Sequence, residues 1–116
     1  MNKLPRTEVQ ERPAGITGYN FTLAKGAEKV IEANPRRRQV VLTVRATGAP
    51  PDDDDYVAIY GKDLHHDTEH KAQALPCAAI YHRNSFTVPG AEEFTVYCPL
   101  TNTDGCVVYV MEIENL

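Results

Sequence analysis

Imidazole and carboxylate side chains gather in one short polar segment, His65-His66-Asp67-Thr68-Glu69-His70. Such side chains at close spacing are the ligands that a divalent transition metal takes. The zincin signature His-Glu-x-x-His is missing, however, and no apolar helix pattern surrounds the segment. We interpret it as a solvated loop and expect no metal and no cofactor. The alternative is a metal-dependent enzyme of cupin-like build that uses His65, His66, His70 or His82.

A second candidate for chemistry is the acidic run Asp52-Asp53-Asp54-Asp55. Carboxylate oxygens attract calcium, but an EF-hand spaces its acids by two, has a central glycine and ends in a bidentate glutamate. None of these features is present in the run. The run therefore predicts a solvated turn, or an electrostatic partner for a basic surface.

The basic run Arg36-Arg37-Arg38 resembles a nucleic-acid patch when it is read alone. It lacks interleaved aromatic residues that would stack on bases, and it leads directly into a strand, where successive side chains point to opposite faces. We expect these arginines to stabilise the turn or to pair with carboxylates of this or a neighbouring chain.

The residues that catalysis needs are present, but they form no known signature. Cys77, Cys98 and Cys106 lie in or beside apolar strand patterns, where we expect buried, reduced thiols of low reactivity. The carboxylate pairs Glu92-Glu93 and Glu112/Glu114 are typical of strand edges kept soluble by charge. No nucleophile elbow, dinucleotide fingerprint or phosphate-binding loop occurs. We therefore predict no enzyme activity and no catalytic residue.

Short β-strands must position all of these side chains, because the apolar residues recur with a period of two. Tyr19, Phe21 and Leu23 alternate with polar residues, and Val40, Leu42 and Val44 form one face of the strongest strand. Residues 56–60 are apolar on both faces, which is typical of a strand between layers or against a partner. Asp104-Gly105 indicates a hairpin turn. The predicted strands are residues 18–23, 29–32, 38–46, 56–60, 77–81, 85–88, 93–98 and 106–113.

Length and composition indicate one domain with an N-terminal arm. The chain has 116 residues, of which 42% are hydrophobic and 24% charged, and its net charge is −4. These values suit a single globular core and argue against attraction to nucleic acid or to an anionic membrane. We predict an all-β fold, a β-sandwich or jelly roll of about seven to eight short strands, with a small β-barrel as the alternative. The domain would span residues 18–116 and the arm residues 1–17.

The arm is rich in proline and polar residues and cannot form much core. We expect it to lie across a neighbouring subunit, with Lys3, Arg6 and Arg12 as candidate contacts. The first residues contain no apolar segment of the kind found in signal peptides, so we expect the protein to be made and kept in a cytoplasm, or assembled there.

Several segments resemble small virion proteins of tailed bacteriophages. In those proteins an apolar strand ends at Asn-Pro, arginines follow, and an apolar strand and a short aromatic strand come next. The segments that carry the resemblance are residues 30–42 (VIEANPRRRQVVL), 56–61 (YVAIYG), 86–90 (FTVPG) and 107–113 (VVYVMEI). The pattern covers about two-thirds of the chain, gives no guide to residues 52–55 or to the histidine-rich segment, and contains no catalytic motif.

The resemblance implies a capsid decoration (cement) protein, which is assembled in the host cytoplasm, binds the exterior of the phage head and reinforces the contacts between coat subunits. Its partners would be the major capsid protein and further copies of itself in a dimer or trimer. The alternative is a carbohydrate- or receptor-binding virion module, such as a head fibre or tail adaptor, in which Tyr56, Tyr60, Tyr81 or Tyr97 presents a ring to a sugar.

Overall fold

The computed structural model describes residues 15–61 and 78–115, and all the regular elements in those ranges are β-strands. No helix of the described ranges is long and apolar enough to cross a membrane. The strands are β1 (Ile16–Leu23), β2 (Glu28–Ile31), β3 (Arg37–Ala46), β4 (Tyr56–Tyr60), β5 (Ala78–Tyr81), β6 (Ser85–Pro89), β7 (Phe94–Tyr97) and β8 (Cys106–Glu114). The protein is therefore all-β, as the alternating sequence pattern predicts.

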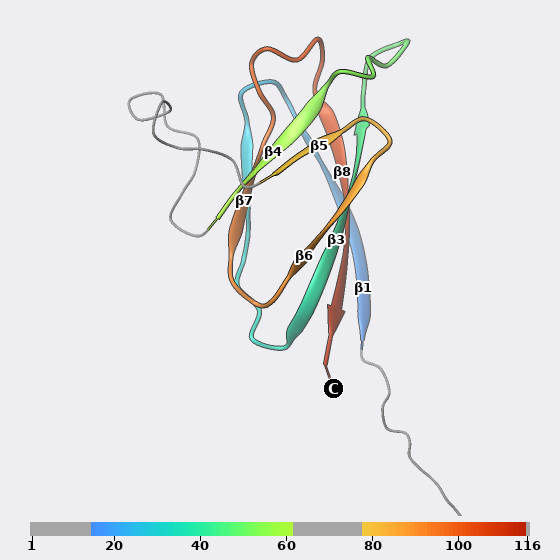
Figure 1. The fold of residues 1–116 in the computed structure, drawn as a ribbon. Coiled ribbons are helices and arrows are strands. Elements are labelled where there is room, and N and C mark those ends of the chain that lie inside the picture. The colour runs from blue at the N-terminus through green and yellow to red at the C-terminus, as the bar shows by residue number, and fades with distance from the viewer. Residues whose placement is uncertain (1–14, 62–77, 116) are drawn as a thin grey trace, which may run out of the picture.

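The strands form two antiparallel sheets, the first ordered β1-β8-β3-β6 and the second β2-β7-β4-β5. β1 pairs with β8 and β3 with β6 in the first sheet, and β2 pairs with β7 and β4 with β5 in the second. Each of these pairs joins a strand of the first half of the chain to a strand of the second half. This pairing is the topology of a jelly roll. Figure 1 shows β1, β8 and β3 side by side in one layer, with β4 and β7 in the other. The predicted sandwich is confirmed, and the sheets do not close into a barrel.

The core lies between the two sheets and takes one face of each strand. In β3, Val40, Leu42 and Val44 are fully buried, as their spacing predicts. In β1 burial fades toward the N-terminal end: Leu23 is buried, Phe21 is half-buried and Tyr19 is 39% exposed. The two sheets are therefore less tightly closed around Tyr19 than around Leu23.

β4 is buried on both faces, as its composition predicts. Val57 and Ile59 belong to the main core, whereas Ala58 and Tyr60 pack with Tyr97 in a second buried cluster. Because side chains alternate along a strand, this second cluster lies on the outer side of the second sheet.

A β-bulge at the start of β3 decides which arginine enters the protein. Strict alternation from Val40 would place Arg38 on the buried face. The register of β3 against β8 shifts between Arg37 and Gln39, and Arg37 is buried while Arg38 is exposed. The extra residue of the bulge thus turns the Arg37 side chain inward.

One predicted boundary and one predicted turn are wrong. β1 begins at Ile16, which pairs with Ile113, so residues 16 and 17 belong to the domain and not to the arm. Asp104-Gly105 does not form a hairpin turn, because the connection from β7 to β8 crosses from the second sheet to the first. Gly105 is required instead by close approach, since a Cβ there would collide with the carbonyl oxygen of Leu23.

The described chain enters and leaves the fold at the same end of the molecule. The Glu114 N–H donates to the carbonyl oxygen of Gly15 at 2.9 Å. Figure 1 shows the C-terminal end beside the start of β1.

Candidate functional site

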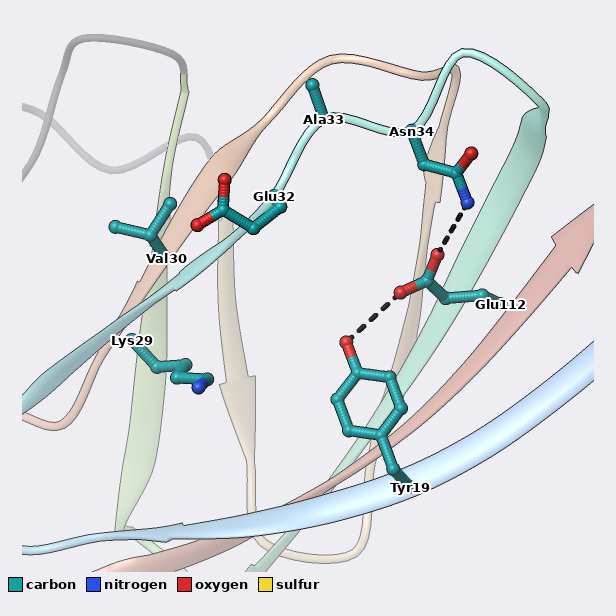
Figure 2. A pocket seen from close by; sticks show the side chains of 7 residues that line it. All are labelled: Tyr19, Lys29, Val30, Glu32, Ala33, Asn34 and Glu112. Carbon is teal, nitrogen blue, oxygen red and sulfur yellow. Dashed lines mark hydrogen bonds between the residues drawn. The ribbon is translucent and has the colours of Figure 1, made fainter.

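A polar groove of about 480 Å³ opens between β1 of the first sheet and β2 of the second, where the sheets are less tightly closed. Figure 2 shows the Tyr19 ring projecting from β1 toward Glu112 of β8, with Lys29 and Glu32 on the side of β2. The lining residues are Tyr19, Lys29, Val30, Glu32, Ala33, Asn34 and Glu112.

The Glu112 carboxylate is the centre of the groove and accepts from several donors. The Tyr19 hydroxyl donates to its Oε2 at 3.1 Å, and the Asn34 amide donates to its Oε1 at 3.4 Å (Figure 2). The same amide donates to Glu114 Oε2 at 2.7 Å. The prediction that Glu112 and Glu114 keep a strand edge soluble is therefore wrong. β8 lies between β1 and β3, and both carboxylates accept hydrogen bonds from Asn34, which follows β2 of the other sheet.

Arg37 lies beneath the groove and is almost completely buried. Its guanidinium donates to the carbonyl oxygens of Glu32, Gly90 and Glu92 at 3.0, 3.2 and 2.6 Å. It also pairs with Glu112 Oε1 at 3.5 Å. One arginine of the basic run thus fixes the loops around the groove, as the sequence predicts, while Arg36 and Arg38 are exposed.

The groove holds Tyr19 in its neutral form. Burial, the hydrogen bond to Glu112 and the negative charge of that carboxylate raise the pKa of Tyr19 to about 12. The phenol is consequently a hydrogen-bond donor at neutral pH, and the contacts of Glu112 are those of a structural anchor.

Titration of Tyr19 is expected to weaken the fold in alkali. Because its pKa is 10.0 in the unfolded reference state and about 12 when folded, its contribution is complete below pH 10.0 and disappears as the pH approaches about 12. The stability advantage of the wild type over Tyr19→Phe, measured by urea unfolding, should therefore shrink between about pH 10 and about pH 12. Other groups titrate equally in both proteins, so their effects cancel in the difference between the two free energies of unfolding. An advantage that stays constant across this range would contradict the assignment.

The acidic run is a structural clamp, which corrects the prediction of a solvated turn. Asp55 is buried, and its carboxylate accepts the N–H groups of Thr103 and Asp104 at 2.7 and 3.0 Å. Asp52 accepts the Asp54 N–H and the Thr103 hydroxyl, and these hydrogen bonds, chiefly the one from Thr103, lower its pKa. The β3–β4 loop thereby holds the β7–β8 loop, and only Asp53 and Asp54 are exposed.

Two of the predicted buried thiols lie together at the base of the β7–β8 loop. Cys98 and Cys106 are free and buried, as predicted, whereas Cys77 lies outside the described residues. Asn102 Nδ2 lies 3.4 Å from Cys98 Sγ and 3.7 Å from Cys106 Sγ. The same amide group pairs with the N–H and carbonyl of Tyr56.

His82 is the histidine that the structure describes, and it too is structural. Its Nδ1 accepts the Ala46 N–H at 2.9 Å, so in the neutral ring the proton is on Nε2. That buried Nε2 has no hydrogen-bond partner among the described residues and lies 3.9 Å from Asp53 Oδ1. Residues 15–61 and 78–115 contain no group of three His, Cys, Asp or Glu side chains that could hold a metal.

The outer face of the first sheet exposes several large apolar side chains. The register places Ile16, Tyr109 and Met111 on this face, and they are 65%, 38% and 41% exposed. Val41, Val107 and Ile113 lie beside them and are half-buried. We use the name outer face for these six residues and their neighbours on β1, β8, β3 and β6.

This outer face carries very little charge. Of the positions that the register pairs on this face, Arg45 is the charged one, and its guanidinium lies 5.9 Å from the centre of the Tyr109 ring. Arg38, at the bulge that begins β3, is exposed as well. Uncharged polar residues such as Asn20, Thr43 and Thr87 share this face with the apolar ones. A group of exposed apolar side chains that is poor in charge and contains Tyr and Met is typical of the centre of a protein interface.

The tyrosines suggested as sugar platforms are mostly unavailable. Tyr60 and Tyr97 are buried and Tyr56 is half-buried. Tyr81 is exposed, with its ring centre 5.0 Å from that of Tyr56. Of this set, Tyr81 is the ring most open to a ligand.

Other predicted site residues lie outside the described part of the chain. They are the arm residues Lys3, Arg6 and Arg12 and the loop residues His65, His66 and His70. The groove, by contrast, was missed by the sequence reasoning. The sequence of β8 contains a sign of it. Glu112 and Glu114 fall at the alternate positions that follow the buried residues Cys106, Val108 and Val110, so their side chains should point inward.

No protein-family model and no curated protein sequence matches the chain. Among solved structures, a Ralstonia eutropha JMP134 protein of unknown function with a cupin-like fold aligns with a TM-score of 0.49 and 13% identity. The alignment covers 87% of this chain and 52% of that one, so the chain spans about half of its length.

Two further structures cover most of both chains. A protein of the disulfide-linked pili of Bacillus endospore appendages has a TM-score of 0.49 and 12% identity over 99% of each chain. The periplasmic g-type lysozyme inhibitor PliG of Aeromonas hydrophila has a TM-score of 0.51 and 6% identity over 87% of this chain and 88% of that one. At such identities the likeness is one of fold.

Proposed function

We propose that this protein is a non-enzymatic capsid decoration protein of a tailed bacteriophage, and that it docks on the major capsid protein through the outer face. The observation that carries the proposal is the contrast between the two sheets. On the outer side of the second sheet the exposed apolar side chains, Val30 and Tyr81, lie on the two edge strands, and Ala58, Tyr60 and Tyr97 are buried between them. The outer face of the first sheet instead exposes Tyr109 and Met111 on its inner strand β8, with Ile16 beside them.

The sequence resemblance supplies the class of partner. The jelly-roll fold is common among viral capsid proteins, which agrees with this role. The same fold also occurs in lectins and cupins. Binding would bury apolar strand surface, and repetition over the capsid lattice would add avidity. In this proposal the protein is a dimer or trimer on the virion exterior, assembled in the host cytoplasm.

The test is co-sedimentation of the purified protein with capsids of the parental phage that lack small accessory proteins. Met111→Lys places a charge at the centre of the outer face and is expected to weaken binding about tenfold or more. The matched control is Leu100→Lys, because Leu100 is 66% exposed but lies on the β7–β8 loop, away from this face. The control should bind like the wild type.

Absence of saturable binding by the wild type would contradict the capsid proposal. Equal binding by the Met111→Lys and wild-type proteins would contradict the assigned face. If sedimentation equilibrium shows that Met111→Lys dissociates a dimer or trimer without changing capsid binding, the outer face joins copies of this chain and another surface meets the capsid.

A carbohydrate- or receptor-binding module is the second candidate, and one observation favours it. The groove presents the Tyr19 ring beside the amide of Asn34 and the carboxylates of Glu32 and Glu112, which are the groups that bind sugar hydroxyls. Glycan-array binding that Tyr19→Ala abolishes would support this function. A glycan signal that survives in Tyr19→Ala would exclude the groove as its site.

A further inference from the structure

Cys98 and Cys106 form a pair that the docking proposal does not use. Both side chains are fully buried and both sulfurs lie within 3.7 Å of the Asn102 amide nitrogen. The Asn102 amide thus lies against both sulfurs, and the Cys106 thiol lies 3.9 Å from the carbonyl oxygen of Tyr56, which accepts from the same amide. They come from different sheets, since Cys98 directly follows β7 and Cys106 begins β8.

We propose that Cys98 and Cys106 are a redox-active thiol pair, which hydrogen peroxide converts into an intramolecular disulfide that joins the two sheets. The proposal concerns this end of the sandwich and does not depend on the capsid proposal.

The environment assigns different roles to the two sulfurs. The hydrogen bond from the Cys106 thiol, together with the Asn102 amide, lowers the pKa of Cys98 to about 7. The hydrogen bond to Cys98 and burial raise the pKa of Cys106. Cys98 therefore supplies the thiolate, and Cys106 acts as the resolving thiol.

The reaction has two balanced steps. The Cys98 thiolate attacks one peroxide oxygen, the O–O bond breaks, and hydroxide leaves and takes up a proton, giving Cys98 sulfenic acid and water. The Cys106 sulfur then attacks the Cys98 sulfur, the S–O bond breaks, and hydroxide leaves with the Cys106 proton as a second water. Overall, two thiols and one hydrogen peroxide give one disulfide and two water molecules.

The position of the pair selects the oxidant and determines the consequence. A small peroxide suits buried sulfurs better than a bulky disulfide such as oxidised glutathione, which needs the β7–β8 loop to open. The new bond would close the loop that Asp52 and Asp55 already hold through Thr103 and Asp104. It would thus add a covalent link to a non-covalent clamp.

The experiment treats the folded protein with hydrogen peroxide, in the wild type and in a Cys77→Ser background that leaves the pair alone. We expect the mass to fall by two hydrogen atoms, with peptide mapping placing the cross-link between Cys98 and Cys106. We also expect the melting temperature to rise by about 10 °C, and a dithiol reductant to reverse the change.

Cys106→Ser in the Cys77→Ser background is the matched control, because its hydroxyl keeps a donor beside Cys98. It should gain oxygen without forming an intramolecular cross-link. The proposal is overturned if the pair gains oxygen while both cysteines are present, if both thiols remain open to alkylation after denaturation, or if the cross-link in the wild type includes Cys77.

Discussion

Replacement of Arg37 by alanine is expected to lower the free energy of unfolding by about 3–5 kcal/mol, the usual effect of breaking a buried ion pair. The guanidinium donates to three carbonyl oxygens that belong to the loops after β2 and β6. Its removal leaves these carbonyls without their donor and takes away the cation paired with Glu112, which keeps the hydrogen bonds from Tyr19 and Asn34. Urea unfolding monitored by circular dichroism measures the effect.

The neighbouring arginines provide matched controls for this prediction. Arg36 and Arg38 are exposed, and their alanine variants should differ from the wild type by about 0.5 kcal/mol or less. Arg37→Lys should restore only part of the loss, because an ammonium cannot present the planar set of donors that several carbonyls require. Equal stability of the three alanine variants would show that Arg37 does not hold the loops.

The second large effect is expected at Asp55. Asp55→Ala should destabilise the protein by about 2–4 kcal/mol, because the Thr103 and Asp104 N–H groups lose their acceptor. Release of the β7–β8 loop should also expose Cys98 and Cys106. Alkylation by iodoacetamide in the folded state should therefore be faster in this variant than in the wild type.

Asp54→Ala is the control, since Asp54 is exposed in the same loop and the β7–β8 loop N–H groups of Thr103 and Asp104 bond to Asp55 instead. It should leave both stability and alkylation rate unchanged. Asp55→Asn should have an intermediate effect, because the amide keeps one acceptor oxygen and turns a donor toward the other N–H. If Asp55→Ala behaves like Asp54→Ala, the acidic run is the solvated turn that the sequence alone suggests.

The sequence reveals the strands well because alternation reports burial directly. Val40, Leu42 and Val44 identify the buried face of β3, and Tyr56–Tyr60 coincides with β4. Pairing between strands is less accessible, since it depends on contacts between distant segments. The Asp104-Gly105 signal fails for this reason: local turn chemistry is outweighed by a crossing between sheets.

In the candidate sites, too, contacts between distant segments of the chain decide the role of each residue. A bulge cannot be located from alternation, so the choice of Arg37 over its neighbours is visible only in the register of β3. Likewise, four adjacent aspartates look equivalent until the β7–β8 loop supplies N–H groups for one of them. Glu112 could have been recognised from its phase in β8, whereas its partners Tyr19 and Asn34 come from distant parts of the chain.

The hydrogen bond between Gly15 and Glu114 has a mechanical consequence. β1 and β8 are antiparallel neighbours, and Gly15 is bonded to Glu114 where they begin and end. A force that pulls these ends apart would peel β1 from β8 one hydrogen bond at a time, instead of loading the ladder all at once. A sandwich that must bear load is therefore better held by its sheet faces than by this end of β1 and β8.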